Sequence, residues 1–360
     1  MFSKKKGLLA LIMLVVTALL AACGSSDKNE NATGSGGKGS SDKVYEINVN
    51  NWQSSTHHYG YNVYEPWKEF VEEKTEGRVK VNLYHGAALG KSSSVYQDIT
   101  GGLYEVSILV PQYFYDTKWF PYSIGNLPFA FESSDQAAAV LTKFAEKYAN
   151  DDLTDLIVMN PTATDPYDMF STKPVKSIDD LKKKKLRSSG KSETALAKGI
   201  GGIPVTLTTE EQYEGLQKKQ VDTTFFTPIG GNGLKLYEPA PYVTKLNVSV
   251  TPLVPVMNKE FYNSLPEDLQ KLFDDELNPK LSELIIKSYA TELDEAYADM
   301  EKALEKRGEV ITISDKELER FKEAGKPAWD EWIADANKKG YPGQEMVDDL
   351  FKMIEEEKSK

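Results

Sequence analysis

The stretch RVKVNLYHGAALGKSSSVYQDITGGLYEVSILV, residues 78–110, contains a complete strand–helix–strand unit. Its first segment, RVKVNLYH, alternates apolar and polar residues as a half-buried strand does, and its last, YEVSILV, is typical of a buried strand. Between them, SSVYQDITGG predicts a helix that stops at Gly101 and Gly102. A helix that connects two strands in this way indicates a mostly parallel sheet. The stretch therefore predicts an α/β fold.

Similar patterns flank this stretch on both sides. VYEINVNNW (residues 44–52) predicts a preceding strand, and YNVYEPWKEFVEEKTEG (61–77) has apolar residues at helical spacing. A second series of strands and helices runs from DLIVMNPTA (155–163) to VDTTFF (221–226). Because 360 residues exceed what one core usually serves, we expect two α/β lobes.

The segment after the second series is strongly helical. From Pro266 to Gly308, apolar residues recur every three to four positions, and only Pro279 interrupts the pattern. This segment is too long for one small lobe. We therefore expect a long helix that braces both lobes.

The N-terminus has the features of an export signal. A basic head, MFSKKKG, precedes an apolar run (residues 8–20) that is too short to span a bilayer, and small residues lead to Cys23. This pattern resembles the lipobox of bacterial lipoproteins, and it predicts a signal peptide over 1–22 and a lipid on Cys23. The Gly-, Ser- and Asn-rich segment 23–42 predicts a flexible tether. We expect the folded part to be held at the outer face of the cytoplasmic membrane.

Charge and cysteine content limit the possible partners. The formal net charge is −12, which disfavours nucleic acid because the summed field repels a polyanion. The lysine run in LKKKKLRSSG (181–190) does not reverse this, and we interpret it as a solvated helix end whose cations complement the helix dipole. Cys23 is the only cysteine, so the chain has no internal disulfide.

Signatures of catalysis are scarce in this sequence. It contains no G-x-S-x-G elbow, no H-E-x-x-H motif and no Walker loop. Two of its three histidines, His57 and His58, are adjacent, which favours a polar loop over a metal site. We expect no enzymatic activity, no cofactor and no bound metal. A secreted hydrolase is the disfavoured alternative, because no nucleophile–base set is visible.

Arginine usage points to a binding residue. The only arginines are Arg78, Arg187, Arg307 and Arg320. Arg187 alone stands at the end of a predicted strand, where ligands bind in open α/β sheets. A guanidinium offers two parallel N–H bonds that match a carboxylate, and it keeps its charge when desolvated. The alternative for Arg187 is an ordinary surface ion pair.

Four segments together resemble a known family. The set consists of EGRVKVNLYHGAALG (76–90), LPFAF (127–131), KPVKSIDDLKKKKLRSSG (173–190) and GIPVTLTTEEQYEGLQKKQVD (202–222). In this order they are similar to the DctP-type solute-binding subunits of tripartite ATP-independent periplasmic (TRAP) transporters. The likeness extends over nearly all of the folded part.

The resemblance implies a two-lobed Venus flytrap whose long helix crosses both lobes. We expect the first lobe to comprise residues 43–164 and about 250–290, and the second lobe to comprise 165–249 and about 291–360. The implied function is capture of a small organic acid and its delivery to the small and large permease subunits in the membrane. Two alternatives remain open: a receptor that serves a sensor kinase, and the binding protein of an ATP-driven importer.

The resemblance also implies that Arg187 forms a salt bridge to the carboxylate of the solute. This chain departs from the family pattern at three places. Lys183 replaces a glycine suited to a left-handed turn. Phe225 and Phe226 replace a polar stretch, and they favour an apolar solute body over a second polar head. The alternative for this pair is simple core packing of the strand. Tyr167 lies in the region where members with two carboxylate clamps carry another arginine.

Further candidates for ligand binding follow from their position after predicted strands. Trp52 and Gln53 follow the first strand, Gln112 and Tyr113 follow the third, and Tyr213 follows the IPVTL strand. The alternative for each of these residues is packing between the lobes.

Overall fold

The computed structural model describes residues 43–360. The predicted signal peptide (1–22), the tether (23–42) and the lipid attachment site Cys23 lie outside the described residues. Within residues 43–360, no helix combines the length and the apolar character that a membrane span requires.

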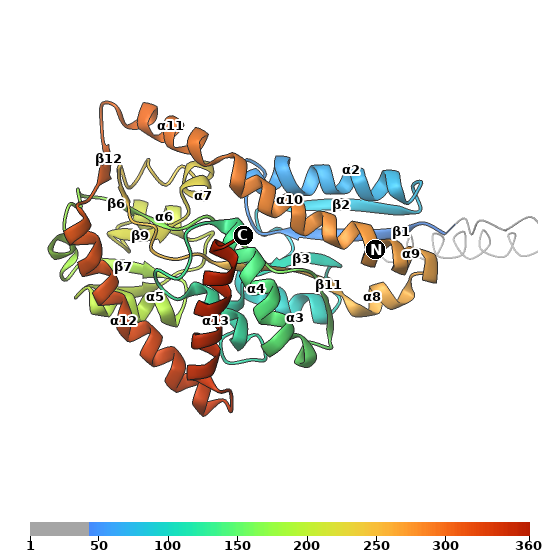
Figure 1. Cartoon of the computed structure of the whole chain (residues 1–360). Helices are drawn as coiled ribbons and strands as arrows, with labels where there is room; N and C mark the ends of the chain where they lie inside the picture. The colour runs from blue at the N-terminus through green and yellow to red at the C-terminus, as the bar shows by residue number, and fades with distance from the viewer. Residues whose placement is uncertain (1–42) are drawn as a thin grey trace, which may run out of the picture. The chain divides into compact units, whose positions relative to one another are not determined.

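The first sheet confirms the α/β pattern around the opening stretch (Figure 1). Its strand order is β2-β1-β3-β11-β4, and β5 pairs with β11. β1 runs parallel to both β2 and β3, whereas β11 is antiparallel to its neighbours. The strands are β1 (Tyr45–Asn51), β2 (Val79–His85), β3 (Val106–Leu109), β4 (Leu156–Val158), β5 (Thr162–Ala163) and β11 (Pro252–Asn258).

The second sheet has the strand order β12-β10-β6-β9-β7-β8. β7 runs parallel to both β8 and β9, so the carboxyl ends of these three strands meet at one edge. β6 is antiparallel to β9 and β10. The strands are β6 (Asp168–Ser171), β7 (Lys185–Ser188), β8 (Ile203–Thr206), β9 (Thr223–Phe226), β10 (Tyr242–Lys245) and β12 (Glu309–Thr312).

Helices of different lengths connect and cover the strands. The α-helices are α2 (Glu65–Lys74), α3 (Val95–Thr100), α4 (Ser134–Tyr148), α5 (Lys191–Gly199), α6 (Gln212–Gln217), α7 (Pro228–Gly233), α8 (Lys259–Ser264), α9 (Glu267–Leu272), α10 (Asn278–Thr291), α11 (Leu293–Leu304), α12 (Asp315–Lys338) and α13 (Gly343–Lys358). Two π-helical turns are η1 (Tyr59–Tyr64) and η7 (Phe273–Leu277). The 3₁₀ turns are η2 (Ser92–Ser94), η3 (Pro111–Phe114), η4 (Phe120–Asn126), η5 (Asn150–Asp152) and η6 (Ile178–Leu181).

Each sheet has its own hydrophobic core, and we call the two groups of elements the first and the second lobe. The first core gathers Val49 of β1 and Ile108 of β3 against Leu281 of α10. The second gathers Leu186 of β7 and Phe225 of β9 with other residues of its lobe. Separate cores of this kind allow two lobes to move against each other as rigid bodies.

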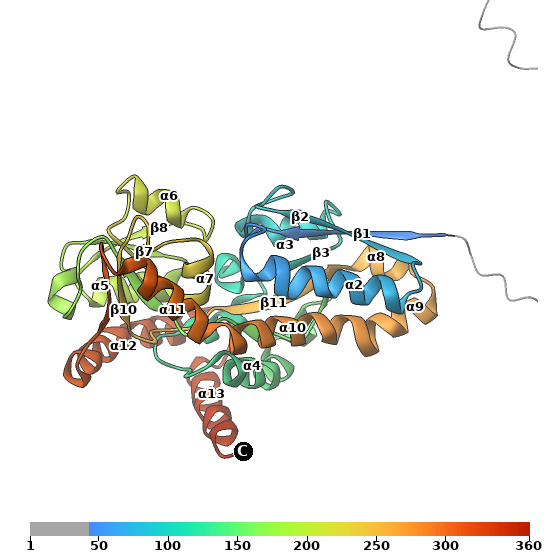
Figure 2. The same ribbon diagram turned by 90° about the horizontal axis from the view of Figure 1, so that it is seen from above.

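A long helical segment runs along both lobes, as expected (Figure 2). α10 packs against η1, η7 and α4 of the first lobe, and α11 packs against α7 and β12 of the second. The interruption lies at Glu292, with φ −105° and ψ −5°, and not at Pro279. Pro279 sits in the first turn of α10, where its missing N–H costs little.

The C-terminal helix α13 does not pack within the second lobe, to which residues 291–360 were expected to belong. α12 packs on α5 of the second lobe, but α13 packs on α4 of the first. The apolar face of α13, with Met346, Leu350 and Ile354, joins a third core that α4 and α12 share. The two C-terminal helices thus connect the lobes at a second place.

Candidate functional site

A cavity of about 20 Å³ lies where strands of both sheets end. This volume has room for roughly one water molecule. Its polar lining follows the strand ends, as expected for an α/β fold. The lining residues are Trp52, Gln53, Tyr59, Val110, Gln112, Tyr113, Thr164, Tyr167, Ser189, Thr209, Phe226, Thr227, Thr251, Leu253 and Tyr289.

Arg187 lies on β7 beside this cavity, and its side chain is 1% exposed. Its Nε donates to the carbonyl of Leu207 at 2.9 Å, and its Nη2 donates to the hydroxyl of Tyr113 at 3.3 Å. Tyr113 lines the cavity, whereas Arg187 is not itself a lining residue in this arrangement. Within residues 43–360, Nη1 has no hydrogen-bond partner. A buried cation therefore keeps one donor uncommitted next to the cavity.

Glu193 of α5 holds the surroundings of Arg187 in place. Its carboxylate lies 3.7 Å from Nη1 of Arg187 and is equally buried. Both carboxylate oxygens are occupied by Ser189, which donates its N–H and its hydroxyl at 2.7 Å each. Burial acts to lower the pKa of Arg187, but Tyr113, Glu193 and Tyr167 raise it, and the net shift is upward. The guanidinium therefore stays charged in its buried position.

Hydrogen bonds from one amide join the lobes across the cavity. Nε2 of Gln112 donates to the hydroxyl of Ser189 at 3.3 Å and to that of Thr251 at 3.0 Å. The hydroxyl of Tyr167 also bonds to Thr251. Oε1 of Gln112 has no partner among the described residues.

Aromatic rings form most of the apolar wall. Trp52 donates from Nε1 to the carbonyl of Ile108 at 2.9 Å, and its ring meets Tyr59 edge to face at 6.3 Å. The hydroxyls of Tyr59 and Tyr289 are 2.8 Å apart. Phe226 of β9 lies 5.8 Å from the ring of Tyr167. These contacts fix the orientation of the rings around the cavity.

Six of the expected residues line the same cavity, with Arg187 bonded to one of them. They are Trp52, Gln53, Gln112, Tyr113, Tyr167 and Phe226. Two expected residues, Phe225 and Tyr213, are placed elsewhere.

Phe225 belongs to the core of the second lobe and is 1% exposed. Successive side chains of a strand point to opposite faces, so Phe225 and Phe226 cannot both face the cavity. The pairing of β9 with β6 aligns Phe226 with Asp168 and Phe225 with Met169. Phe226 thus lines the cavity, and Phe225 packs in the core of the second lobe.

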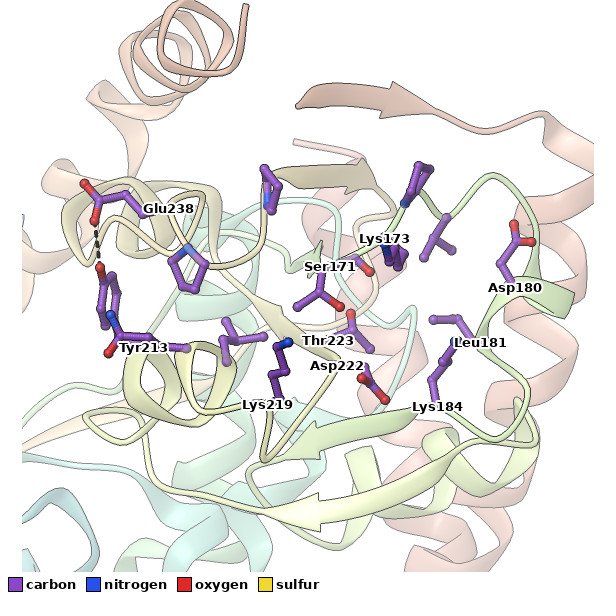
Figure 3. Close-up of a pocket in the computed structure, with 17 residues that line it drawn as sticks. Ser171, Lys173, Asp180, Leu181, Lys184, Tyr213, Lys219, Asp222, Thr223 and Glu238 are labelled. Atoms are coloured by element: carbon purple, nitrogen blue, oxygen red, sulfur yellow. Dashed lines mark hydrogen bonds between the residues drawn. The ribbon is translucent and has the colours of Figure 1, made fainter. Parts of the chain in front are cut away.

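Tyr213 lines a different and larger hollow of about 690 Å³, shown in Figure 3. Its hydroxyl donates to Glu238 at 2.7 Å. The preceding residue, Gln212, is buried and accepts from the hydroxyl of Thr224 on β9. Because Gln212 takes the position that faces the sheet, Tyr213 points away from the cavity. This corrects the expectation for Tyr213.

His57 and His58 are buried, which corrects the expectation of a polar loop. Their rings lie 4.3 Å apart at the start of η1, and Nδ1 of His58 bonds to the hydroxyl of Ser288 on α10. Burial lowers the pKa of His57 to about 3 and, together with His57, lowers the pKa of His58 well below its usual value. Both rings are therefore neutral at physiological pH. Nothing in the sequence indicates that these two histidines are buried, because a pair of adjacent polar residues is more typical of an exposed loop.

Glu193 is another residue that sequence reasoning missed. It lies on α5, in the stretch KSETALAKG. Its position four residues after Ser189 could have identified it, because a carboxylate at that spacing can accept hydrogen bonds from the residue that follows the strand. For metals, residues 43–360 contain no cluster of three or more His, Cys, Asp or Glu side chains that fits an ion.

Comparisons with known proteins identify the family of this chain. The family model described as bacterial extracellular solute-binding protein, family 7 (DctP), matches residues 49–335. A solute-binding protein of Sulfitobacter sp. (strain NAS-14.1) is 28% identical over 210 residues, which span 57% of this chain and 63% of that protein. The sialic acid-binding periplasmic protein SiaP of Vibrio cholerae is 25% identical over 78% of this chain and 86% of its own length.

Solved structures show the same fold. A TRAP solute-binding protein from a marine metagenome, in complex with 3-hydroxybenzoate, superposes with a TM-score of 0.80. It is 23% identical and the match covers 88% of this chain and 99% of that chain. The family model covers most of the chain, and the solved structures share its two-lobed fold. The chain therefore belongs to the DctP family of bacterial extracellular solute-binding proteins, whose members are binding proteins and not enzymes.

Proposed function

We propose that this chain captures a small organic acid between its lobes, with Arg187 as the anchor of the carboxylate. The observation that carries this proposal is the uncommitted Nη1 donor of a fully buried guanidinium at the edge of the cavity. Burying a charged group is costly unless it is paired and hydrogen-bonded. Its present neighbour Glu193 is bonded to Ser189, so a solute carboxylate would complete the set of partners of Arg187.

Binding would require the lobes to open and close. A cavity of about 20 Å³ is far smaller than the pockets that hold organic ligands, which measure roughly 300–1,000 Å³. Opening would break the contacts of Tyr113 and Gln112 in the first lobe with Arg187 and Ser189 in the second. The solute would favour closure because it touches both lobes at once.

The hinge would lie in two segments that cross between the sheets side by side. The N–H of Thr164 donates to Thr251 at 3.0 Å, and that of Tyr167 donates to Ser249 at 2.7 Å. Paired crossing segments bend together, so the lobes would rotate as units. The break between α10 and α11 at Glu292 gives the long helical segment a third bending point.

Location and partners extend the same proposal. The apolar run before Cys23 would direct export, and a lipid on Cys23 would hold the protein at the outer face of the cytoplasmic membrane. The closed form would then deliver its solute to the small and large permease subunits of a TRAP transporter. The family match and the TRAP neighbours favour this role over service to a sensor kinase or an ATP-driven importer.

Calorimetric titration against a panel of carboxylates tests the proposal. Arg187→Ala should weaken the best ligand by about 3 kcal/mol, roughly a hundredfold, because a charge-assisted hydrogen bond is lost and Glu193 is left uncompensated. Arg187→Lys should weaken it less, since it keeps the charge and loses the fork of donors. The matched control is Lys184→Ala, which removes a cation from the other hollow. Undiminished binding by Arg187→Ala would overturn the assignment.

A further inference from the structure

We infer that the solute is an aromatic monocarboxylate with a hydroxyl group on its ring. This inference rests on the proposed function, because it assumes that Arg187 holds a carboxylate in the cavity between the lobes. Three features of the cavity carry it: the number of nearby cations, the composition of the wall and the set of unused hydrogen-bond acceptors.

Arg187 bonds to Tyr113 of the lining, and the buried Asp165 carboxyl lies near Tyr289 of the lining. No lysine or arginine is among the lining residues in the described part of the chain, and Arg187 is the cation that contacts the lining. Burial raises the pKa of Tyr289 well above its usual range, and nearby Tyr59 and the Asp165 carboxyl raise it further. A second carboxylate at the Tyr59–Tyr289 end would be taken out of water with no lysine or arginine of the lining to pair with. The charges favour a solute with one carboxylate.

The wall is suited to a flat aromatic body. Aromatic rings prefer offset or edge-to-face contacts with one another, and a planar solute can make both within such a wall. A hydroxyl-rich chain would instead leave most of its polar groups against carbon. Six of the lining residues are aromatic: Trp52, Tyr59, Tyr113, Tyr167, Phe226 and Tyr289.

Three buried oxygens on the lining have no hydrogen-bond partner among the described residues. They are Oε1 of Gln53, Oε1 of Gln112 and Oγ1 of Thr227. Gln53 and Gln112 belong to the first lobe and Thr227 follows β9 of the second, so a donor on the solute could contact both lobes. An oxygen left unsatisfied in a buried site costs free energy, and a solute hydroxyl would remove that cost.

The other polar groups of the lining are already committed to each other. The hydroxyl of Thr209 is bonded to Tyr113, that of Ser189 to Glu193, and that of Thr251 to Gln112. A sugar acid with hydroxyls along its chain would have to break these bonds. One ring hydroxyl needs only the acceptors that remain.

Titration of the full chain, freed of any copurified solute, tests the inference with five probes. These are benzoate, 3-hydroxybenzoate, 4-hydroxybenzoate, succinate and gluconate. We expect one hydroxybenzoate to bind at least tenfold more tightly than benzoate and at least a hundredfold more tightly than succinate or gluconate. If succinate or gluconate binds best and depends on Arg187, the inference is wrong and the proposed function stands. If none of the five binds, the inference is wrong, and the proposed function is decided separately by the wider carboxylate panel and Arg187→Ala.

A variant isolates the part played by the hydroxyl. Thr227→Val removes one hydroxyl and keeps the shape of the side chain, so it should weaken the preferred hydroxybenzoate about fivefold more than it weakens benzoate. The matched control is Thr100→Val on the exposed end of α3, which should change neither affinity. Equal losses for both ligands in Thr227→Val, or equal affinities of the parent for benzoate and the hydroxybenzoates, would refute the role of the hydroxyl.

Discussion

The two hollows lie at opposite ends of the same strands of the second lobe. Ser189 and Thr227, which follow β7 and β9, line the cavity of about 20 Å³ between the lobes. Lys184 and Asp222, which precede these strands, line the outer hollow of about 690 Å³. The larger hollow is thus at the amino ends, and the smaller one is at the carboxyl ends, where α/β folds place their ligands.

The two hollows also differ in the burial of their charged and polar groups. The lysines that line the outer hollow include Lys184, before β7, and Lys219, after α6. Both are exposed to solvent, which screens their charge. Arg187 at the cavity is buried with one donor unused, and several lining oxygens there lack partners. Buried polar groups without partners are rare in folded proteins. Their presence, and not the size of the hollow, indicates which of the two binds a solute.

The largest expected effect is a difference in stability and solute affinity between variants of two neighbouring residues on β9, Phe225 and Phe226. Phe225→Ala should lower the free energy of unfolding by about 4 kcal/mol, because it empties a packed core position. Phe226→Ala should lower it less, since Phe226 borders a cavity, but it should weaken solute binding more. Urea unfolding and calorimetry of both variants measure these differences. Equal losses of affinity would mean that the two faces of β9 are not separated as the structure has them.

Buried acid near the cavity predicts a pH effect on stability. Burial raises the pKa of Asp165 well above 3.8, and nearby Asp168 raises it further. The folded protein therefore binds a proton there that the unfolded chain releases, and this stabilisation fades as the pH rises above about 4 toward the raised pKa. Asp165→Asn cannot lose a proton, so its stability relative to the parent should rise by up to about 1.4 kcal/mol per pH unit in that window.

Thermal or urea unfolding from pH 4 to pH 8 measures this difference. Because the same histidines titrate in both chains, their contributions largely cancel in the comparison. Asp180→Asn, in the outer hollow, serves as the matched control for removing one carboxylate. A stability of Asp165→Asn relative to the parent that falls as the pH rises would contradict the assigned direction.

A smaller effect is expected at the rim of the cavity, where Glu210 of the second lobe reaches Ser92 of the first. Its carboxylate accepts the N–H of Ser92 at 3.1 Å and the hydroxyl at 2.9 Å. Glu210→Gln should weaken this contact by about 1 kcal/mol, which favours the open form and lowers solute affinity about fivefold. The exposed pair Lys91–Glu211 spans the same gap at 3.0 Å. Lys91→Ala should change affinity less than twofold, because exposed ion pairs contribute little.

Much of the fold could be predicted from local pattern. Alternation in RVKVNLYH and the apolar run before Pro111 identified β2 and β3, because strand period and burial are written in neighbouring residues. The antiparallel entry of β11 into the first sheet was not predicted, nor was the contact of α13 with α4. Both contacts join segments that are far apart in the chain, and the local sequence of a segment does not indicate its distant partner.

The candidate site shows the same limit. Arg187 stood out because arginine is scarce and this one ends a strand, and the structure places it beside the cavity. Choosing between Phe225 and Phe226 required the register of β9 against β6. The buried Glu193 looked like any helix carboxylate, since burial depends on what packs on the helix.

The smallest expected effect tests whether the amino ends of the strands are independent of the cavity. Lys183 precedes β7 with φ +60°, a left-handed conformation that costs a residue with a side chain about 1–2 kcal/mol more than glycine. Lys183→Gly should raise the free energy of unfolding by about 0.5–1 kcal/mol, after the greater freedom of glycine in the unfolded chain is subtracted. Lys182→Gly, at φ −57°, gains no such relief and should be less stable than the parent. Solute affinity should stay unchanged in both, and a change in Lys183→Gly would mean that the turn at one end of β7 influences Arg187 at the other.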